Sequence, residues 1–181
     1  MKYYCPACES EQETLVIQKQ ETYPVKGEPT TIQANVCTCA KCGEEIMTLQ
    51  YDDDNLRRAY AKYRSRHGLL QPEEIKAIRE QYEVSQITFA RIIGVGDKTI
   101  ARYENGSLQD EAINNLILLA KDPKNFLLLL DRNESKIAPE EAERLRKTFG
   151  EVRVFVRWSN TQGPYVCSFN DKPDYALYGV S

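Results

Sequence analysis

Two pairs of cysteines with C-x-x-C spacing are the residues of this chain best suited to chemistry. They are Cys5 with Cys8 and Cys39 with Cys42. A C-x-x-C loop points two thiolates at one ion, and Gly43 after the second pair permits a tight turn. Two such pairs form a tetrahedral thiolate cage, the usual arrangement of a structural Zn²⁺ site. Because protein ligands fill all four positions, we expect this zinc to stabilise a fold and to take no part in catalysis.

The cysteines leave other interpretations open. A disulfide framework is disfavoured because no signal peptide precedes Cys5. A rubredoxin-like iron site fits the same ligands, but nothing else in the chain indicates electron transfer. Cys37 could replace Cys39 as a ligand, although C-x-x-C-G fits the loop better, and we expect it to be a spare thiol. Cys167 lies in an apolar run and is expected to be a small core residue.

Charge is distributed unevenly along the 181 residues. Residues 1–55 hold four basic (Lys/Arg) and ten acidic (Asp/Glu) side chains. Residues 56–104 hold ten basic and six acidic side chains, and residues 105–181 hold ten basic and eleven acidic ones. A basic middle beside an acidic front suggests phosphates as partners of the first and a basic protein as a partner of the second. Ordinary solvated surface is the alternative.

Several classes of protein are disfavoured by composition. No apolar run is long enough to span a membrane. The single histidine, His67, lies beside Arg66, which indicates a solvated helix end and gives no Ser-His or Cys-His pair. We therefore expect a cytoplasmic protein with no enzymatic activity.

The elements expected to position the cysteines are β-strands. Residues 14–18 and 31–36 are β-rich, and the turn residues Pro24, Gly27 and Pro29 lie between them. With a cysteine pair at each end, this pattern predicts a zinc-bound β-hairpin or ribbon domain over residues 1–50. A core this small should need its metal, so folding and metal binding should be coupled.

A helical linker is expected over residues 51–70. Asp52–Asp54 would cap a basic helix running from Leu56 to about Arg66, and Gly68 would end it. The fold class is therefore α+β, with an all-α domain expected next over residues 71–131. Its predicted helices begin at Pro72, after a Ser85 cap, after an Asp97 cap, at Asp110 and at Pro123.

Residues 86–100 have the spacing of a helix-turn-helix. Ala90 is small enough for two helices to cross closely, Gly94 supplies a left-handed turn position, and Ile100 fills the shared core. The second helix of such a motif enters the major groove with its N-terminal end first. The residues expected to contact DNA are Gln86, Asp97, Lys98, Thr99, Arg102 and Asn105. A generic α-helical hairpin is the alternative.

The order of motifs resembles the MqsA-type (YgiT-type zinc finger) antitoxins of bacterial toxin–antitoxin systems, over roughly residues 1–130. The segments that carry the resemblance are residues 5–8, 39–45, 68–75, 89–91, 94–96 and 101–106. The resemblance implies a zinc domain that binds the cognate toxin and an Xre-type helix-turn-helix domain that dimerises and represses its own operon. The family's operator-contacting arginine falls on Arg102, and Lys98 stands where the family often has asparagine. A regulator with the same architecture and no toxin partner is the alternative.

Residues 132–181 have no counterpart in short members of that family. An amphipathic helix is expected over residues 139–149, a half-buried strand over 152–158, a turn at 162–164 and a second strand over 165–169. Because two strands alone are marginally stable, they should pack on another domain or a partner.

The helices that close the all-α domain are more apolar than a small domain needs. We expect about half of their apolar residues to be core and the rest to form a two-fold dimer seam, as a palindromic operator would require. These residues are Ile113, Leu116, Ile117, Leu119 and the run 126–130.

Overall fold

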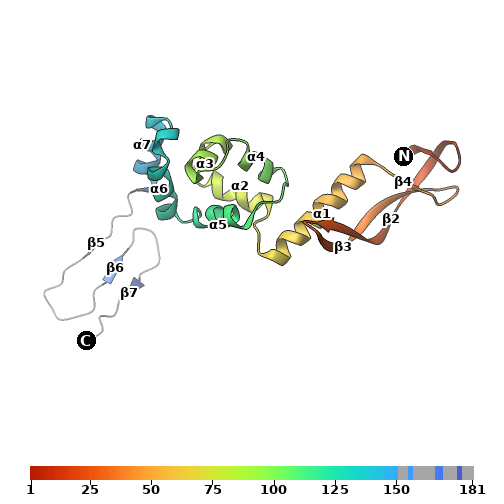
Figure 1. The fold of residues 1–181 in the computed structure, drawn as a ribbon, viewed down its shortest axis with the longest axis horizontal. Coiled ribbons are helices and arrows are strands. Elements are labelled where there is room, and N and C mark those ends of the chain that lie inside the picture. The colour runs from red at the N-terminus through yellow and green to blue at the C-terminus, as the bar shows by residue number, and fades with distance from the viewer. Residues whose placement is uncertain (151–154, 157–165, 169–174, 177–181) are drawn as a thin grey trace.

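The computed structural model describes residues 1–150, 155–156, 166–168 and 175–176. It belongs to the α+β class, as expected. Figure 1 shows the β-hairpin and its long helix α1 at one end and the remaining helices gathered next to them. No helix in these ranges has the length and apolar character needed to cross a membrane.

The N-terminal part is a four-stranded antiparallel sheet in the order β1-β2-β3-β4. Its strands are β1 (Lys2–Cys5), β2 (Ser10–Val25), β3 (Glu28–Cys39) and β4 (Glu45–Ile46). The β2–β3 ladder runs from Thr14 opposite Cys39 to Val25 opposite Glu28. Pro24 and Pro29 therefore face each other as the next-to-last pair of the ladder and are not turn residues, contrary to expectation. Only residues 26 and 27 form the turn, with φ of 47° and 83°.

Helix α1 (Leu49–His67) begins earlier than the sequence indicated. Its N-cap is Thr48, so the expected start at Leu56 and the expected capping by Asp52–Asp54 are wrong. The aspartates lie inside the helix, and Asp52 is in the first turn, where negative charge is favourable. Gly68 ends the helix in the left-handed conformation, with φ of 63°, as expected.

Helix α1 shares a hydrophobic core with the hairpin. Its Ala59 and Tyr63 are buried against Ile32 and Ala34 of β3 and Val25 of β2. Burial on one face of the sheet makes α1 part of the N-terminal unit as well as its connection to the helices that follow.

The helical body contains α2 (Pro72–Glu80), α3 (Gln86–Ile93), α4 (Thr99–Glu104), α5 (Glu111–Leu119), α6 (Pro123–Arg132), the 3-10 turn η1 (Glu134–Lys136) and α7 (Pro139–Phe149). Pro72 is at the first position of α2. The Ser85 hydroxyl accepts a hydrogen bond from the Thr88 amide at the start of α3. Both start signals are confirmed. Asp97 does not cap α4, because the N-cap position is occupied by Lys98.

One core joins α2 to α7. Tyr82 stacks on Phe126 with ring centroids 3.6 Å apart, and Phe149 meets the Tyr82 ring edge-on at 5.0 Å. Ala142 and Leu145 of α7 are completely buried in the same cluster. The core of the helical body thus continues past residue 131, where the sequence led us to end the domain.

The C-terminal residues that the structure describes form a small antiparallel sheet in the order β5-β6-β7. Its strands are β5 (Phe155–Val156), β6 (Val166–Ser168) and β7 (Tyr175–Ala176). The expected pairing of the first two strands is present, with Phe155 opposite Ser168. The third strand was not anticipated. The expected turn at 162–164 and the Cys167 side chain lie outside what the structure describes.

Candidate metal centre and nucleic-acid interface

The four paired cysteines converge at the base of the hairpin. The Sγ atoms of Cys5, Cys8, Cys39 and Cys42 all lie within 4.8 Å of one another. Cys5 and Cys42 are 3.5 Å apart, and Cys8 and Cys39 are 4.0 Å apart. A Zn–S bond of about 2.3 Å in a tetrahedron places sulfur atoms about 3.8 Å apart, so the donor set fits such an ion.

Strand pairing creates this convergence. Cys5 ends β1 and Cys39 ends β3, on either side of β2. The second C-x-x-C loop closes with the Gly43 amide donating to the Cys39 carbonyl at 2.9 Å. Gly43 has φ of 77°, a conformation that favours glycine, which confirms its expected role in the turn.

The electrostatics of the centre depend on backbone amides and on crowding of the thiols. Backbone N–H groups of Cys42 and Lys41 lower the pKa of Cys39 to about 7. Hydrogen bonding to Cys42, followed by burial, raises the pKa of Cys8 to about 12. A divalent cation would supply the positive charge that allows four adjacent thiols to ionise together.

Cys37 lies outside the four-cysteine cluster. It is buried with Cys5, Cys39 and Ile46 and is 2% exposed. Its position on β3, two residues before Cys39, places it in the small core that supports the metal centre.

The helix-turn-helix anchors occupy their expected places. Ala90 and Ile100 are completely buried in the helical core. Gly94 ends α3 in the left-handed conformation with φ of 81°, and the Val95 amide donates to the Ala90 carbonyl at 2.9 Å. A glycine in this conformation lets the chain reverse tightly between α3 and α4.

The residues expected to contact DNA fall into two groups. Lys98, Arg102 and Asn105 are exposed. Within the described residues, Lys98 and Arg102 make no side-chain hydrogen bond or ion pair. Asp97 is also exposed, but Arg91 holds its carboxylate through two hydrogen bonds of 3.0 and 2.8 Å. This contact lowers the pKa of Asp97.

Thr99 and Gln86 are half-buried. The Gln86 side chain donates to Glu104 at 2.7 Å, which ties the start of α3 to the end of α4.

Sequence reasoning missed the ion pair that supports α4. Arg79 of α2 donates to both carboxylate oxygens of Glu104, at 2.7 and 3.0 Å. The two side chains are 12% and 6% exposed. Hydrogen bonding to Glu104 raises the pKa of Arg79. The two residues are 25 positions apart, so no local spacing indicates the contact.

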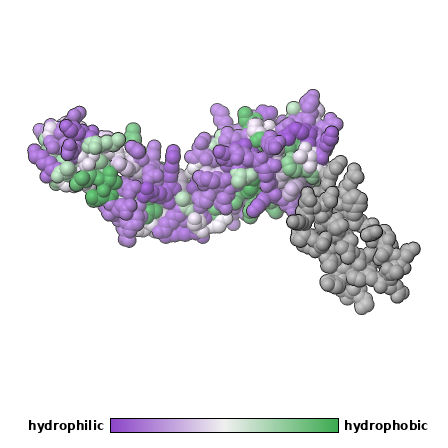
Figure 2. Space-filling model, turned by 180° about the vertical axis from the view of Figure 1, so that it is seen from behind, coloured by the Kyte–Doolittle hydropathy of each residue, from purple (hydrophilic) through white to green (hydrophobic). Residues whose placement is uncertain are grey.

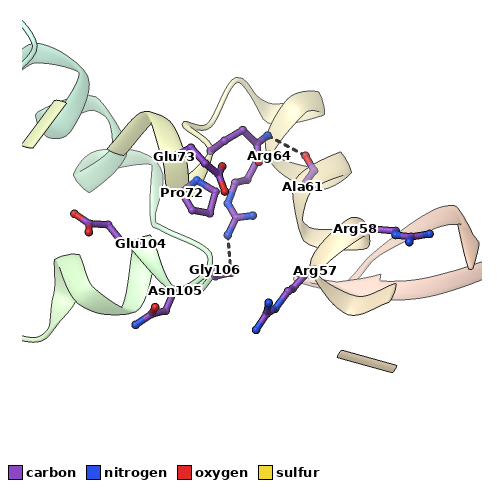
Figure 3. A pocket seen from close by; sticks show the side chains of 10 residues that line it. Arg57, Arg58, Ala61, Arg64, Pro72, Glu73, Glu104, Asn105 and Gly106 are labelled. Carbon is purple, nitrogen blue, oxygen red and sulfur yellow. Dashed lines mark hydrogen bonds between the residues drawn. The ribbon is translucent and has the colours of Figure 1, made fainter. Parts of the chain in front are cut away.

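A cleft of about 380 Å³ separates α1 from the end of α4 (Figure 3). Arg64 of α1 reaches across it and donates to the Gly106 carbonyl at 2.6 Å and the Ser107 carbonyl at 3.2 Å. Burial lowers the pKa of Arg64, and its guanidinium fixes α1 to the loop after α4. Figure 3 shows Arg57 projecting into the opening while Arg58 turns toward the hairpin.

The fold and the two sites define a class of protein, one in which a four-cysteine β domain precedes a helix-turn-helix body. Residues 1–133 match the family model described as the antitoxin component of bacterial toxin–antitoxin systems, MqsA. The chain therefore belongs to the MqsA antitoxin family. A comparison with curated proteins gave no match. Residues 134–181, which include α7, lie beyond the matched segment.

Proposed function

We propose that this antitoxin acts in the cytoplasm, neutralises its toxin through the four-cysteine domain and represses its own operon through the helix-turn-helix. The observation that carries the DNA-binding part is the surface of α4. It presents Lys98 and Arg102, both exposed, and the helix is fixed to α2 by the partly buried Arg79–Glu104 pair. A rigid helix that offers unpaired cations meets the requirements of a major-groove reader.

Each exposed side chain has a role in this proposal. Arg102 is long enough to donate to N7 and O6 of a guanine, while Lys98 grips a phosphate or a base edge. Thr99 contacts a thymine methyl group or a phosphate. Asn105, just beyond the end of α4, donates a hydrogen bond to the DNA backbone. Arg91 offsets the charge of Asp97, which reduces repulsion between this carboxylate and the phosphates.

We propose that the repressor is a homodimer on a palindromic operator. Leu118 and Leu119 of α5 and Leu128 of α6 are 48%, 55% and 64% exposed, whereas Ile117 is completely buried. This division fits the expectation that part of the apolar surface is core and part is a two-fold seam.

Zinc is the ion that we propose for the four-cysteine centre. Cys5, Cys8, Cys39 and Cys42 would hold it, and four thiolates suit a structural site without an open coordination position. Its contribution is to join the ends of β1 and β3 and so to stabilise the base of the hairpin. No catalytic step is assigned to this protein.

The test uses the full chain and DNA from upstream of its own operon. We expect specific binding with a Kd of about 10 nM or tighter at physiological salt, at least about 1,000-fold tighter than binding to a scrambled duplex. We also expect a stable complex with the toxin encoded beside it. Equal affinity for operator and scrambled DNA would remove the repressor assignment, and absence of a toxin complex would remove the neutralisation assignment.

A further inference from the structure

The two long edges of the β2–β3 hairpin differ in how they are covered. Polar side chains of α1 form hydrogen bonds with successive backbone groups of β3 that point outward, away from β2. The Asn55 side chain accepts a hydrogen bond from the Asn35 amide at 2.9 Å and donates one to the Asn35 carbonyl at 2.8 Å. Three cations of α1 donate to further carbonyls of β3: Arg58 to Gln33 at 3.4 Å, Lys62 to Thr31 at 2.7 Å and Arg66 to Pro29 at 3.3 Å. Helix α1 thus takes the place of a neighbouring strand along β3, and this edge cannot accept another chain.

The register shows which groups of β2 face the opposite edge. The Ala40 amide donates to the Glu13 carbonyl at 2.9 Å, so the odd-numbered residues of β2 bond toward β3. The Thr14 amide donates to the Met1 carbonyl at 3.1 Å, so the even-numbered residues point to the other side, where β1 lies. Alternation along an antiparallel strand extends this division through the whole ladder.

Strand β1 covers only the first part of this outer edge. Its pairing spans residues 10–13 of β2. Beyond Thr14, the outward amides and carbonyls belong to Val16, Gln18, Gln20 and Thr22, and in the part of the chain that the structure describes no strand pairs with them. Pro24 occupies the next outward position, where the lack of an N–H breaks no bond to β3. The result is a free edge of β2 that continues the line of β1 and offers the backbone groups of these four residues.

The side chains around this edge indicate the kind of partner. Leu15, Val16 and Ile17 are 59%, 48% and 43% exposed. Figure 2 shows apolar surface on this end of the molecule. Residues 1–55 hold ten acidic and four basic side chains. A second copy would bring two acidic units together, whereas a basic protein would be attracted.

We propose that the β2 edge from Val16 to Thr22 is the docking strand of this protein, to which a basic toxin adds an edge strand of its own. Main-chain hydrogen bonds would extend the sheet, and the apolar side chains at residues 15–17 would be covered by the added strand and its neighbours. This inference rests on the proposed neutralisation of a toxin and specifies how the toxin is held.

Amide hydrogen exchange, resolved by residue, tests the proposal on the unaltered chain. In the free protein, amides of Val16, Gln18, Gln20 and Thr22 should exchange rapidly, while those of Ile17, Lys19 and Glu21 are protected by β3. Bound to the toxin encoded beside this chain, the even-numbered amides should slow by at least about tenfold, as new hydrogen bonds require. If they stay rapid in a formed complex, the proposal is wrong although neutralisation stands.

A substitution gives a second, independent measurement. Gln20→Pro removes one outward amide and none of the β2–β3 bonds, and Gln20→Ala controls for loss of the side chain. We expect Gln20→Pro to weaken toxin binding by about 10- to 100-fold, because a partner carbonyl is left unpaired. Gln20→Ala should bind normally, and both variants should keep their metal and their affinity for DNA. Equal toxin affinity of the two variants would overturn the proposal, and if Gln20→Pro loses its metal, the exchange experiment decides.

Two further outcomes separate the alternatives. If the wild-type chain forms no complex with the toxin, the proposed neutralisation and this docking strand both fail. If the even-numbered amides become protected in the toxin-free protein as its concentration rises, the edge joins two copies of this chain, and the assignment to a toxin is wrong.

Discussion

Removing the carboxylate of Glu104 should destabilise the helical body strongly. Glu104→Ala deletes the acceptor of three hydrogen bonds, two from Arg79 and one from Gln86, with lengths of 2.7, 3.0 and 2.7 Å. Breaking a buried ion pair by removing one partner costs about 3–5 kcal/mol. This pair is only partly buried and Arg79 retains a bond to the Val84 carbonyl at 3.0 Å, so we expect the lower end, about 3 kcal/mol.

Urea unfolding followed by far-ultraviolet circular dichroism measures this change. The matched control replaces both partners with apolar residues, Arg79→Met together with Glu104→Leu. Because the double variant leaves no uncompensated charge, it should recover much of the lost stability. Operator affinity of Glu104→Ala should fall as well, since α4 loses the contact that fixes it to α2. A loss below about 1 kcal/mol for Glu104→Ala would refute the view that this pair supports α4.

Three other predictions concern the metal, the DNA contacts and the C-terminal helix. Cys39→Ser should lose bound zinc and unfold the β domain, whereas Cys37→Ser should keep its metal; elemental analysis of the purified variants decides, and the reverse result would exchange their roles. Arg102→Ala should weaken operator binding by about 1–3 kcal/mol and leave non-specific binding nearly unchanged. If Lys98 grips a phosphate, Lys98→Ala should weaken all sequences alike and reduce the salt slope by roughly one per protomer; unchanged operator affinity in both variants would exclude α4 from the groove. A chain ending after Asn133 should unfold or aggregate because it lacks α7 from its core, and a cooperative unfolding transition equal to that of the full chain would contradict this.

Local chemistry was readable from the sequence. The spacing of two C-x-x-C pairs, a proline before an acidic first turn, a serine cap at residue 85 and a glycine at 94 each constrain a few neighbouring residues. These signals picked out the four cysteines that the structure brings together, most helix starts and the reversal between α3 and α4. Family resemblance then added the expected antitoxin class, which the family match over residues 1–133 supports.

Contacts between distant residues were decided by the tertiary structure. Helix α1 begins at Leu49 and not at the expected Leu56, because it packs on the hairpin along most of its length. Asp97, expected to cap α4, forms an ion pair with Arg91 instead. Glu104 forms an ion pair with Arg79 of α2.

The same reason explains the two edges of the hairpin. Alternating side chains mark residues 10–25 as a strand, but they do not say which neighbour lies on each side. Only packing of α1 along β3 shows that one edge is covered, and only the short reach of β1 shows that the other is free. A sequence pattern reports the periodicity of one element, whereas coverage of its backbone depends on where other elements come to lie.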